Sequence, residues 1–475
     1  MGGVTPARSG AAAAFGSALG EREAATLAWA CAFALMTTAL LWPALSNRFP
    51  VIFYDTGGYL MAAIDGTLVN GRSALYGAFL ALGIPLDFWP NVIAQAAATA
   101  WIVILTLRVH GFRRPWLAAM LIMGLAVFTS LPWYAAQLMP DVLVPAATLA
   151  LYLLAFRSAL LRRWEILSLA AIIAFAMASH MSILALALGL IACGAALALV
   201  ATRMRWTRPN VALPAITVAA GIALALLSNL ALAGRLAFTP GGTSFVFGRL
   251  VQDGIVARYL DDMCPDETIR LCAYRDELPG TADEWLWDPS PLAKLGGWDA
   301  YEDEARRIII DTLQRYPGMH VKSAIAATLA QFVQAQTGDG LTPWQWTTHW
   351  AIEIKAPNAY PKLMAARQQQ EDYDFPSNFA WLNYAHVPVL ALSFIALPIL
   401  LVGGRVRRPA KTLCATVLLA LIGNAAICGV FSNPHDRYQS RLAPLAPLAV
   451  AIAMLGVRPQ RRAIPVLSSA AVRPG

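Results

Sequence analysis

The sequence predicts an all-α polytopic membrane protein with about ten transmembrane helices and a mostly helical extracytoplasmic insert. Of the 475 residues, 58% are hydrophobic and only 13% are charged, whereas about 25% are charged in a typical soluble domain. Apolar runs of about 20 residues, long enough to cross a hydrocarbon core of roughly 30 Å as helices, recur along the chain. The predicted spans are residues 24–45, 88–108, 116–132, 140–157, 166–179, 183–202, 211–233, 383–403, 412–430 and 442–457.

Three of these spans allow more than one interpretation. The runs at 166–179 and 183–202 adjoin, and one helix through both would be longer than a bilayer is thick, so we expect a break at 179–182. The span at 24–45 has an alternative as a signal peptide, but its apolar region is longer than is usual in a signal peptide, and "ALSN" after it is a weak cleavage site.

The distribution of basic residues predicts the orientation in the membrane. Every even-numbered span is followed by a basic cluster, whereas the loops after the third and fifth spans contain neither Lys nor Arg. The positive-inside rule then places both termini in the cytoplasm and the chain in the cytoplasmic (inner) membrane. The net charge of +8 therefore reflects topology, and we expect no nucleic-acid partner. The clusters are Arg108, Arg113 and Arg114; Arg157, Arg162 and Arg163; Arg203, Arg205 and Arg208; Arg405, Arg407, Arg408 and Lys411; and Arg458, Arg461 and Arg462.

This topology divides the chain into consecutive parts. The predicted parts are a cytoplasmic tail at 1–23, seven spans at 24–233 with a first outer loop at 46–87, an extracytoplasmic insert at 234–382, three spans at 383–457 and a cytoplasmic tail at 458–475. Apolar faces at helical period and Pro- and Gly-rich loops indicate that the insert is helical.

The insert also contains two features with alternative explanations. Cys264 and Cys272 are predicted to form a disulfide in an oxidising compartment, and metal binding by the two thiols is less favoured because no His lies beside them. The scattered tryptophans favour a small core with aromatics at the headgroup level, with a sugar-stacking surface as the alternative. They are Trp285, Trp287, Trp298, Trp344, Trp346 and Trp350.

Ionisable and polar side chains recur at the predicted outer ends of the spans. Such groups are costly near an apolar layer, so they are usually paired or functional. The shared depth of residues far apart in sequence predicts one site on the outer face. The residues are Asp55, Asp65, Gln137, Asp141, His180, His386, His435, Asp436, Arg437, Tyr438 and Arg441.

Each of these residues also has a structural interpretation. Asp55 is either functional or a solvated loop residue, and Asp141 is either functional or a helix N-cap. His180 is either part of the site or a buried, hydrogen-bonded histidine, and His386 is expected at the interface. Arg437 either pairs with Asp436 or binds an anionic ligand, which a guanidinium does in a bidentate manner.

An outer-face carboxylate with a histidine and arginines suits transfer from a lipid-linked phosphate. Arg437, Tyr438 and Arg441 would bind the donor phosphate, and arginine would stabilise it as it leaves. A carboxylate would act as general base on an acceptor hydroxyl or amine. Because ATP is absent outside the cytoplasm, an activated lipid is a suitable donor.

Three stretches resemble the GT-C class of membrane glycosyltransferases, which includes the protein O-mannosyltransferase-like and aminoarabinose transferase-like families. "FYDTGGYL" contains Asp55 and Tyr59, similar to the acidic-plus-tyrosine pattern in the first outer loop of that class. "MPDVLVPAATLALYLLAF" resembles the opening of its fourth helix, and "HDRYQSRLAPLAPL" resembles a late Arg-Tyr segment followed by prolines. The likeness covers about a hundred residues and the multi-span architecture.

The resemblance implies a polyprenyl-phosphate sugar donor and Asp55 as the catalytic base. We expect Tyr59, Asp141, His180 and His435 to support the site. It allows a divalent metal without implying one. Members of the class often have a second acid beside the first, whereas here Thr56, Gly57 and Gly58 follow Asp55. The insert matches no family domain.

The sequence thus predicts an integral membrane glycosyltransferase that moves a sugar from a polyprenyl-phosphate donor to an envelope acceptor. One alternative is a transporter or flippase for a lipid-linked glycan, but the chain has no internal repeat and its spans carry almost no charge at mid-depth. Another is a non-catalytic assembly protein whose insert binds an envelope partner. The expected partners are the donor and membrane lipids, and oligomeric state is not predicted.

Overall fold

The computed structural model describes residues 9–204, 206–370 and 378–456. Within these ranges the chain is helical throughout and forms no strand, only two isolated bridges, Val51 with Gln137 and Val69 with Arg72. The all-helical prediction is confirmed. Arg205, the first residues of the predicted N-terminal tail and the C-terminal tail, with Arg458, Arg461 and Arg462, lie outside the described residues.

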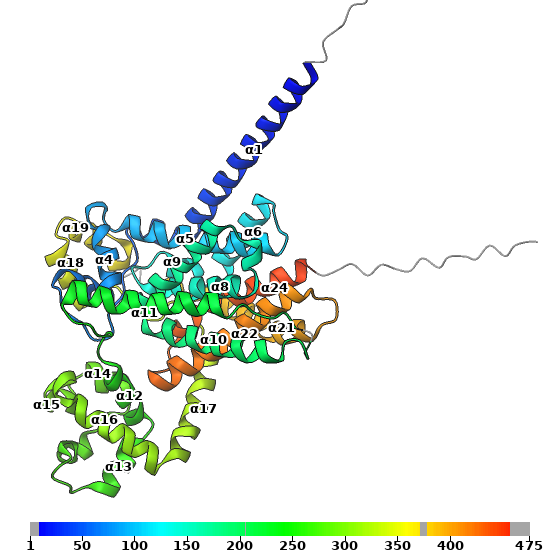
Figure 1. Ribbon diagram of the computed structural model, residues 1–475. Helices are drawn as coiled ribbons and strands as arrows, with labels where there is room; N and C mark the ends of the chain where they lie inside the picture. Colours follow the sequence, from blue (N-terminus) through cyan, green and yellow to red (C-terminus); the bar gives the residue numbers. More distant parts are fainter. Residues whose placement is uncertain (1–8, 205, 371–377, 457–475) are drawn as a thin grey trace, which may run out of the picture.

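Each of the ten predicted spans overlaps a helix. The helices are α1 (Ser9–Leu40), α5 (Trp89–Val109), α6 (Pro115–Phe128), α8 (Leu143–Phe156), α9 (Arg163–Ser179), α10 (Met181–Val200), α11 (Ala212–Ala233), α21 (Asn383–Val402), α22 (Arg408–Phe431) and α24 (Leu445–Leu455). The C-terminal part of α1 and the other nine helices pack around one apolar core, whereas the N-terminal part of α1 projects away from the bundle (Figure 1).

Six helical segments in the described part of the chain are long and apolar enough to cross a membrane: Glu23–Leu40, Trp89–Val109, Met181–Val200, Ala212–Ala233, Ala380–Val402 and Arg408–Phe431. The segments Pro115–Phe128 and Pro140–Phe156 are apolar but shorter. A helix of 14 residues is about 21 Å long at 1.5 Å per residue. A membrane protein is therefore supported, and the count of ten spans stays a prediction.

The break expected at 179–182 is present. Helix α9 ends at Ser179, and His180 adopts an extended conformation before α10 begins at Met181. The His180 Nδ1 atom accepts a hydrogen bond from the backbone N–H of Ser182, which caps the start of α10.

The basic ends of several helices meet at one end of the bundle. The Arg157 guanidinium, after α8, donates to the carbonyl of Val109 at the end of α5. The Tyr152 hydroxyl donates to the carbonyl of Pro409 at the start of α22, and the N–H of Asn210, just before α11, donates to the carbonyl of Ala155. The loops that the sequence places on one side of the membrane are therefore neighbours in space.

Short helices form the opposite end of the bundle. They are α2 (Trp42–Asn47), α3 (Thr56–Ile64), α4 (Ala74–Leu82), η1 (Ile84–Leu86), α7 (Leu131–Ala135), η2 (Pro140–Val142) and α23 (Asp436–Ser440). The Ser158–Leu160 turn (η3) lies at the basic end, after α8.

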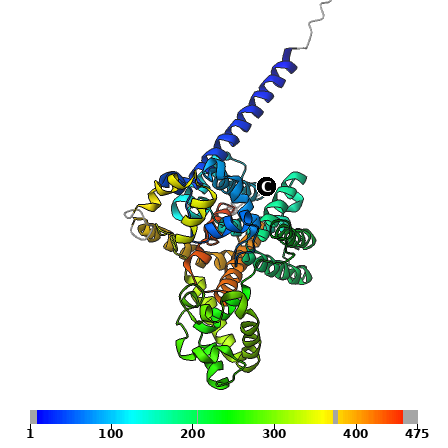
Figure 2. The same cartoon turned by 90° about the vertical axis from the view of Figure 1, so that its left-hand side faces the viewer.

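The first part of the insert forms a separate lobe below the bundle (Figure 2). Phe247, Trp285 and Tyr301 are fully buried at the centre of its own apolar core. Cys264 and Cys272, for which the sequence predicts a disulfide, are bonded to each other within it. The lobe consists of α12 (Gly242–Gln252), α13 (Ile255–Met263), η4 (Arg270–Glu277), α14 (Ala282–Trp287), α15 (Pro291–Lys294) and α16 (Gly297–Arg315).

The second part of the insert returns to the bundle. Helix α17 (Pro317–Val333) packs along α22, and α18 (Trp346–Lys355) packs on α3. Ile352, Ala356 and Leu363 are buried in the main core rather than in the lobe. The region predicted as one insert is therefore divided by the packing of its apolar faces. The remaining short elements are α19 (Tyr360–Met364), η5 (Arg367–Gln369) and η7 (Ala380–Leu382).

Candidate functional site

The backbone of the first outer loop is paired with the segment that precedes Asp141. The Val51 N–H donates to the carbonyl of Ala136, and the Val51 carbonyl accepts from the N–H of Leu138. The Thr56 hydroxyl, next to Asp55, donates to the carbonyl of Leu138. These bonds bring Asp55 and Asp141 to one end of the bundle, although 85 positions separate them in the chain.

The returning part of the insert fixes the other side of this loop. The Gln368 side-chain amide exchanges two hydrogen bonds with the backbone of Ile52. The Thr348 hydroxyl donates to the carbonyl of Phe53 and accepts from the N–H of Gly57. Asp55 therefore lies at the start of α3 on a backbone that is held from both sides, as a positioned functional group requires.

Five charged side chains, Asp55, Arg72, Asp141, Arg437 and Arg441, form what we call the charge cluster. Arg72 donates to Asp55. The Arg437 Nη2 atom lies 3.5 Å from Asp55 Oδ2 and 3.8 Å from Asp141 Oδ2. Arg441 Nη1 donates to Asp141 Oδ1 over 2.9 Å. Arg437 therefore links two ion pairs that would otherwise be separate.

Arg441 is the buried member of the cluster. Its side chain is 0% exposed and that of Asp141 is 2% exposed. Arg441 Nη2 also donates to the Ser182 hydroxyl over 3.1 Å, and the Ser182 hydroxyl lies 2.8 Å from His180 Nδ1. Its guanidinium is thus committed to the protein interior, which indicates a supporting role for this predicted phosphate ligand.

Arg437 is held less tightly. Its distances to both carboxylates exceed the 2.7–2.9 Å of a charge-assisted hydrogen bond. Within the described ranges no protein group forms a hydrogen bond with its guanidinium. Only the backbone of Arg437 is hydrogen-bonded: its backbone N–H donates to Asp339, and its backbone carbonyl accepts from the Tyr134 hydroxyl. The side chain is 13% exposed. This arginine has donors to offer to a ligand.

Aromatic rings orient the two arginines. The Arg437 guanidinium carbon lies 4.1 Å from the centre of the Phe53 ring and 5.2 Å from that of Tyr438. The Tyr438 ring is also 5.2 Å from the guanidinium carbon of Arg441. Cation–π contact holds a guanidinium plane in place without using its N–H donors. Tyr438, predicted at the phosphate, thus lies between both arginines.

The charges around Asp55 control its ionisation. Partial burial would raise the pKa of this carboxyl, but the positive charges of Arg72 and Arg437 outweigh burial and hold the pKa below its usual range. Asp55 is therefore a carboxylate at neutral pH. A ligand that draws Arg437 away would raise the pKa of Asp55 and make it a stronger base.

His435 connects the cluster to the lobe. Its Nε2 atom lies 3.1 Å from Asp283 Oδ2 in the lobe, and its Nδ1 atom lies 3.7 Å from Asp339 Oδ2. Asn433 donates to Asp283 and accepts from Arg249 of α12. Arg437 lies two residues after His435, so the position of the lobe is coupled to the cluster.

An aromatic surface adjoins Asp55 on the side of the lobe. The Arg72 guanidinium carbon lies 5.3 Å from the centre of the Trp287 ring. The Trp287 ring lies 5.3 Å from that of Trp298, which lies 5.3 Å from that of Phe245. Trp287 is 52% exposed, whereas Trp285, two residues earlier, is buried. Trp285 thus belongs to the small core that the sequence favours, and a sugar-stacking surface at the exposed tryptophans stays a prediction.

The other predicted polar residues lie outside the cluster. Asp65 pairs with Lys355 of α18, and Gln137 accepts through its carbonyl from Gln95. His386 is buried and contacts the Thr337 hydroxyl and the Val127 carbonyl. Tyr59 is buried against Tyr76.

Asp436 accepts from the N–H of Gln336, so the alternative pairing with Arg437 is not observed among the described residues. The two charged residues of this dipeptide therefore have different partners.

Sequence reasoning missed Arg72 and Asp339. Both are lone charged residues, the first in "GRSALYG" and the second in "TGDG", and their isolation beside apolar stretches was the available signal.

Sequence reasoning also missed the role of the glycines after Asp55. A Cβ atom on Gly58 would lie 3.2 Å from the Arg72 side chain, and one on Gly57 would lie 2.7 Å from Thr347 O. The glycines leave room for Arg72 and α18.

The space beside Arg437 is small. A pocket of about 10 Å³, lined by Phe53, Tyr134, Asp339 and Arg437 among others, holds about one water molecule. No group of three or more His, Cys, Asp or Glu side chains lies together as a metal site in the part of the chain that the structure describes.

We compared the chain with protein-family models, curated proteins and solved structures, and none of them matches.

Proposed function

We propose that this protein is an integral membrane glycosyltransferase that uses a polyprenyl-phosphate sugar as donor and an envelope acceptor. The observation that carries the proposal is the position of Arg437, a partly exposed guanidinium between two carboxylates with no hydrogen bond of its own side chain to a described protein group. The charge cluster contains one more positive than negative side chain, and a phosphate would balance it.

The proposed reaction assigns each atom to a residue. The acceptor oxygen forms a bond to the anomeric carbon of the sugar, and the bond from that carbon to the phosphate oxygen breaks. The leaving phosphate takes the electron pair and is stabilised by Arg437. Asp55 accepts the proton of the acceptor hydroxyl. Because the phosphate competes for Arg437, donor binding raises the pKa of Asp55 before the proton is transferred.

The surroundings support the same assignment. Arg72 stays hydrogen-bonded to Asp55 and positions it, while Arg441 neutralises the buried Asp141. The aromatic surface of Phe245, Trp287 and Trp298 lies on the far side of Arg72. The exposed ring of Trp287 beside a polar group favours an acceptor with an apolar ring face, such as a sugar.

Binding of polyprenyl monophosphate, the part common to all such donors, tests the proposal. We would reconstitute the full chain in nanodiscs and compare polyprenyl monophosphate with uncharged polyprenol. We expect the wild type to prefer the phosphate and Arg437→Gln to lose that preference by roughly tenfold or more, as for a lost charge-assisted contact.

The matched control is Arg258→Gln, which removes a charge from an exposed ion pair with Asp262 in the lobe. It should leave the preference unchanged. Equal binding of polyprenol and its phosphate by the wild type would overturn the donor assignment. Phosphate binding that survives Arg437→Gln would overturn the role of this residue. A transporter of the same lipid would also bind the phosphate, but it would not transfer the sugar of a polyprenyl-phosphate sugar to an acceptor hydroxyl.

A further inference from the structure

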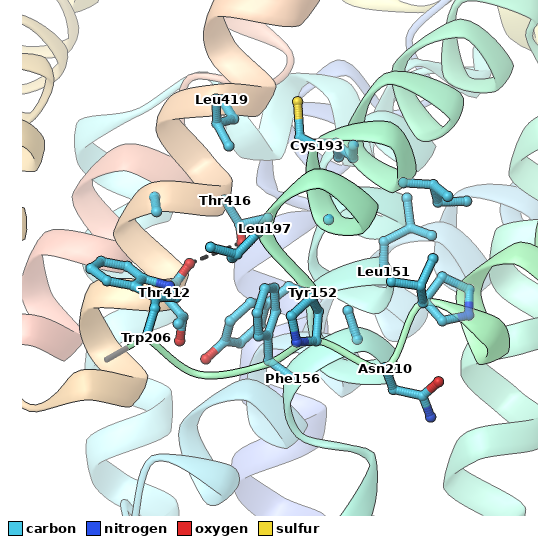
Figure 3. Close-up of a pocket in the computed structure, with 18 of the residues that line it drawn as sticks. Leu151, Tyr152, Phe156, Cys193, Leu197, Trp206, Asn210, Thr412, Thr416 and Leu419 are labelled. Carbon is cyan, nitrogen blue, oxygen red and sulfur yellow. Dashed lines mark hydrogen bonds between the residues drawn. The ribbon is translucent and has the colours of Figure 1, made fainter. Parts of the chain in front are cut away.

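An apolar groove of about 270 Å³ lies at the basic end of the bundle (Figure 3). Its walls come from α8, α10, α11 and α22 and from the loop before α11. Tyr152, Phe156, Leu197, Trp206 and Leu419 are among the side chains around it (Figure 3).

The groove is separate from the charge cluster. Helix α10 begins beside the cluster at His180 and reaches the groove at Leu190–Leu197. At 1.5 Å per residue, the ten positions from His180 to Leu190 span about 15 Å, and the far edge of the groove at Leu197 lies about 25 Å along the helix. A ligand of the groove would therefore lie away from Arg437, and its binding does not depend on the proposed transferase activity.

The hydroxyl groups around the groove already have partners. The Tyr152 hydroxyl donates to the Pro409 carbonyl, and the hydroxyls of Thr412 and Thr416 donate to the carbonyls of Pro409 and Thr412. Because these donors are satisfied within the protein, the walls present hydrocarbon to a ligand. This favours an alkyl chain over a polar small molecule.

A loop closes the end of the groove. The N–H of Asn210 donates to the Ala155 carbonyl over 2.7 Å, and the N–H of Trp206 donates to the Ala201 carbonyl over 2.8 Å. The volume of about 270 Å³ is far larger than the roughly 10–15 Å³ that one water requires. The groove is thus a bounded site that is large enough for a segment of an alkyl chain.

The charge around the groove has one sign. The segments that supply its lining, residues 151–156, 190–214 and 412–419, contain no Asp or Glu. Arg208 directly precedes the lining residues Pro209 and Asn210, and Lys411 directly precedes Thr412. Arg208 is exposed and Lys411 is half-buried. A ligand with an apolar chain and an anionic head matches this arrangement.

We propose that this groove binds one acyl chain of an anionic phospholipid, with the headgroup phosphate at Arg208 and Lys411. Basic pockets between transmembrane helices on the cytoplasmic side bind anionic headgroups in this way. The sequence places this end of the bundle in the cytoplasm, where the leaflet supplies such lipids. Zwitterionic phospholipids share the acyl chain but lack the net charge that the basic residues select.

Lipid retention by the purified full chain tests the proposal. Native mass spectrometry would compare phosphatidylglycerol with phosphatidylethanolamine of identical acyl chains, and with polyprenyl monophosphate as competitor. We expect the wild type to retain phosphatidylglycerol over phosphatidylethanolamine by roughly tenfold or more. The double variant Arg208→Gln, Lys411→Gln should lose this preference. Equal retention of both lipids, or displacement by polyprenyl monophosphate at equal concentration, would overturn the proposal.

A pair of glycines on α10 separates groove binding from general lipid contact. Gly194 lines the groove, whereas Gly189 on the same helix does not, and a Cβ atom on either meets nothing within 4 Å. Gly194→Leu should fill the groove and abolish retention, while Gly189→Leu should keep it. Retention that survives Gly194→Leu would place the lipid elsewhere and overturn the proposal.

The wild-type chain offers a second measurement if Gly194→Leu fails to fold. Cys193 lines the groove and its thiol is exposed, and Cys31 is an exposed free cysteine elsewhere. Phosphatidylglycerol should slow the reaction of N-ethylmaleimide with Cys193 while leaving Cys31 unchanged. Equal slowing by phosphatidylethanolamine, or no slowing at Cys193, would overturn the proposal.

Discussion

Arg437 and Arg441 are one helical turn apart but make different contacts. Arg441 is buried and forms hydrogen bonds with Asp141 and Ser182, whereas Arg437 is partly exposed and lies between two carboxylates at longer distances. A buried ion pair contributes to the integrity of the fold because either charge alone would be uncompensated. The partly exposed arginine is the one available for a ligand.

Arg441→Gln is therefore expected to destabilise the protein. Removal of one partner from a buried ion pair costs about 3–5 kcal/mol because the other charge stays buried. Thermal unfolding of the variant in detergent would measure the loss. Arg258→Gln, in an exposed pair, should change stability by less than about 1 kcal/mol. Similar unfolding temperatures for wild type and Arg441→Gln would contradict the assignment of a structural role.

Arg72 positions Asp55, and its loss should appear in a pH profile. Arg72 and Arg437 hold the pKa of Asp55 below its usual range. Arg72→Gln removes one of these charges, so the pKa rises and the carboxylate form is lost at a higher pH. The acidic limb of transfer activity should then shift to higher pH, whereas a purely structural role would lower activity equally at all pH values. An unshifted limb would contradict the prediction.

The crossing of α3 and α18 depends on a residue without a side chain. A Cβ atom on Gly57 would lie 2.7 Å from Thr347 O and from Thr348 Cα, both backbone atoms that cannot rotate away. The same contact includes the hydrogen bond from the Gly57 N–H to Thr348. The two glycines after Asp55, which distinguish the chain from the paired acids of the GT-C class, thus have a packing reason.

Gly57→Ala should accordingly lower stability by about 1–3 kcal/mol, the usual cost of overpacking. Gly124→Ala is the matched control, because Gly124 lies within α6 and a Cβ atom there meets nothing within 4 Å. Alanine is also the better helix former, so the control should be neutral or slightly stabilising. Equal thermal stability of both variants would show that α3 and α18 can separate at no cost.

Contact between the lobe and the bundle is expected to depend on pH. Burial lowers the pKa of His435, but its hydrogen bond to Asp283 and the charge of Asp339 outweigh burial and raise the pKa above its usual value. A His with a raised folded pKa stabilises the contact fully below its unfolded pKa of about 6.5. That contribution is lost as pH rises through the folded value.

Hydrogen exchange in α14 and in residues 431–436 would measure this dependence. The protection should be greater at pH 6 than at pH 9, and His435→Gln should remove most of the difference. Exchange in α13, whose buried side chains pack in the lobe core, should respond much less. Protection that increases with pH in the wild type would contradict the sign of the effect.

At the scale of the whole molecule, the lobe that contains the disulfide lies beside one end of the apolar bundle. Because disulfides persist in oxidising compartments, the Cys264–Cys272 bond fits an extracytoplasmic lobe. In cells, an impermeant thiol reagent should label these two cysteines only after reduction. Closure of a short loop contributes about 2–3 kcal/mol, so reduction should also increase proteolysis of the lobe. Labelling without reduction would contradict the disulfide, and no labelling after reduction would contradict the predicted orientation.

Local sequence predicted much of the architecture because helical periodicity and apolar run length are local properties. The break at His180 followed from the length of one apolar run, and the helices overlap the predicted spans. The division of the insert was not predicted, since whether α17 and α18 bury their apolar faces in the lobe or in the bundle depends on surfaces formed by distant segments.

By itself, the sequence determined an all-helical apolar chain, the ends at which charged residues gather and the residues Asp55, Asp141, Arg437 and Arg441 as candidates. Only the tertiary structure decided that Arg437 lies between Asp55 and Asp141, that Arg441 is buried and that Arg72 joins them. The reason is physical, because hydrophobicity is a property of each segment, whereas an ion pair depends on segments that are distant in the chain. Here it requires the backbone hydrogen bonds between Val51 and residues 136–138, and the close approach of Arg72 to Gly58.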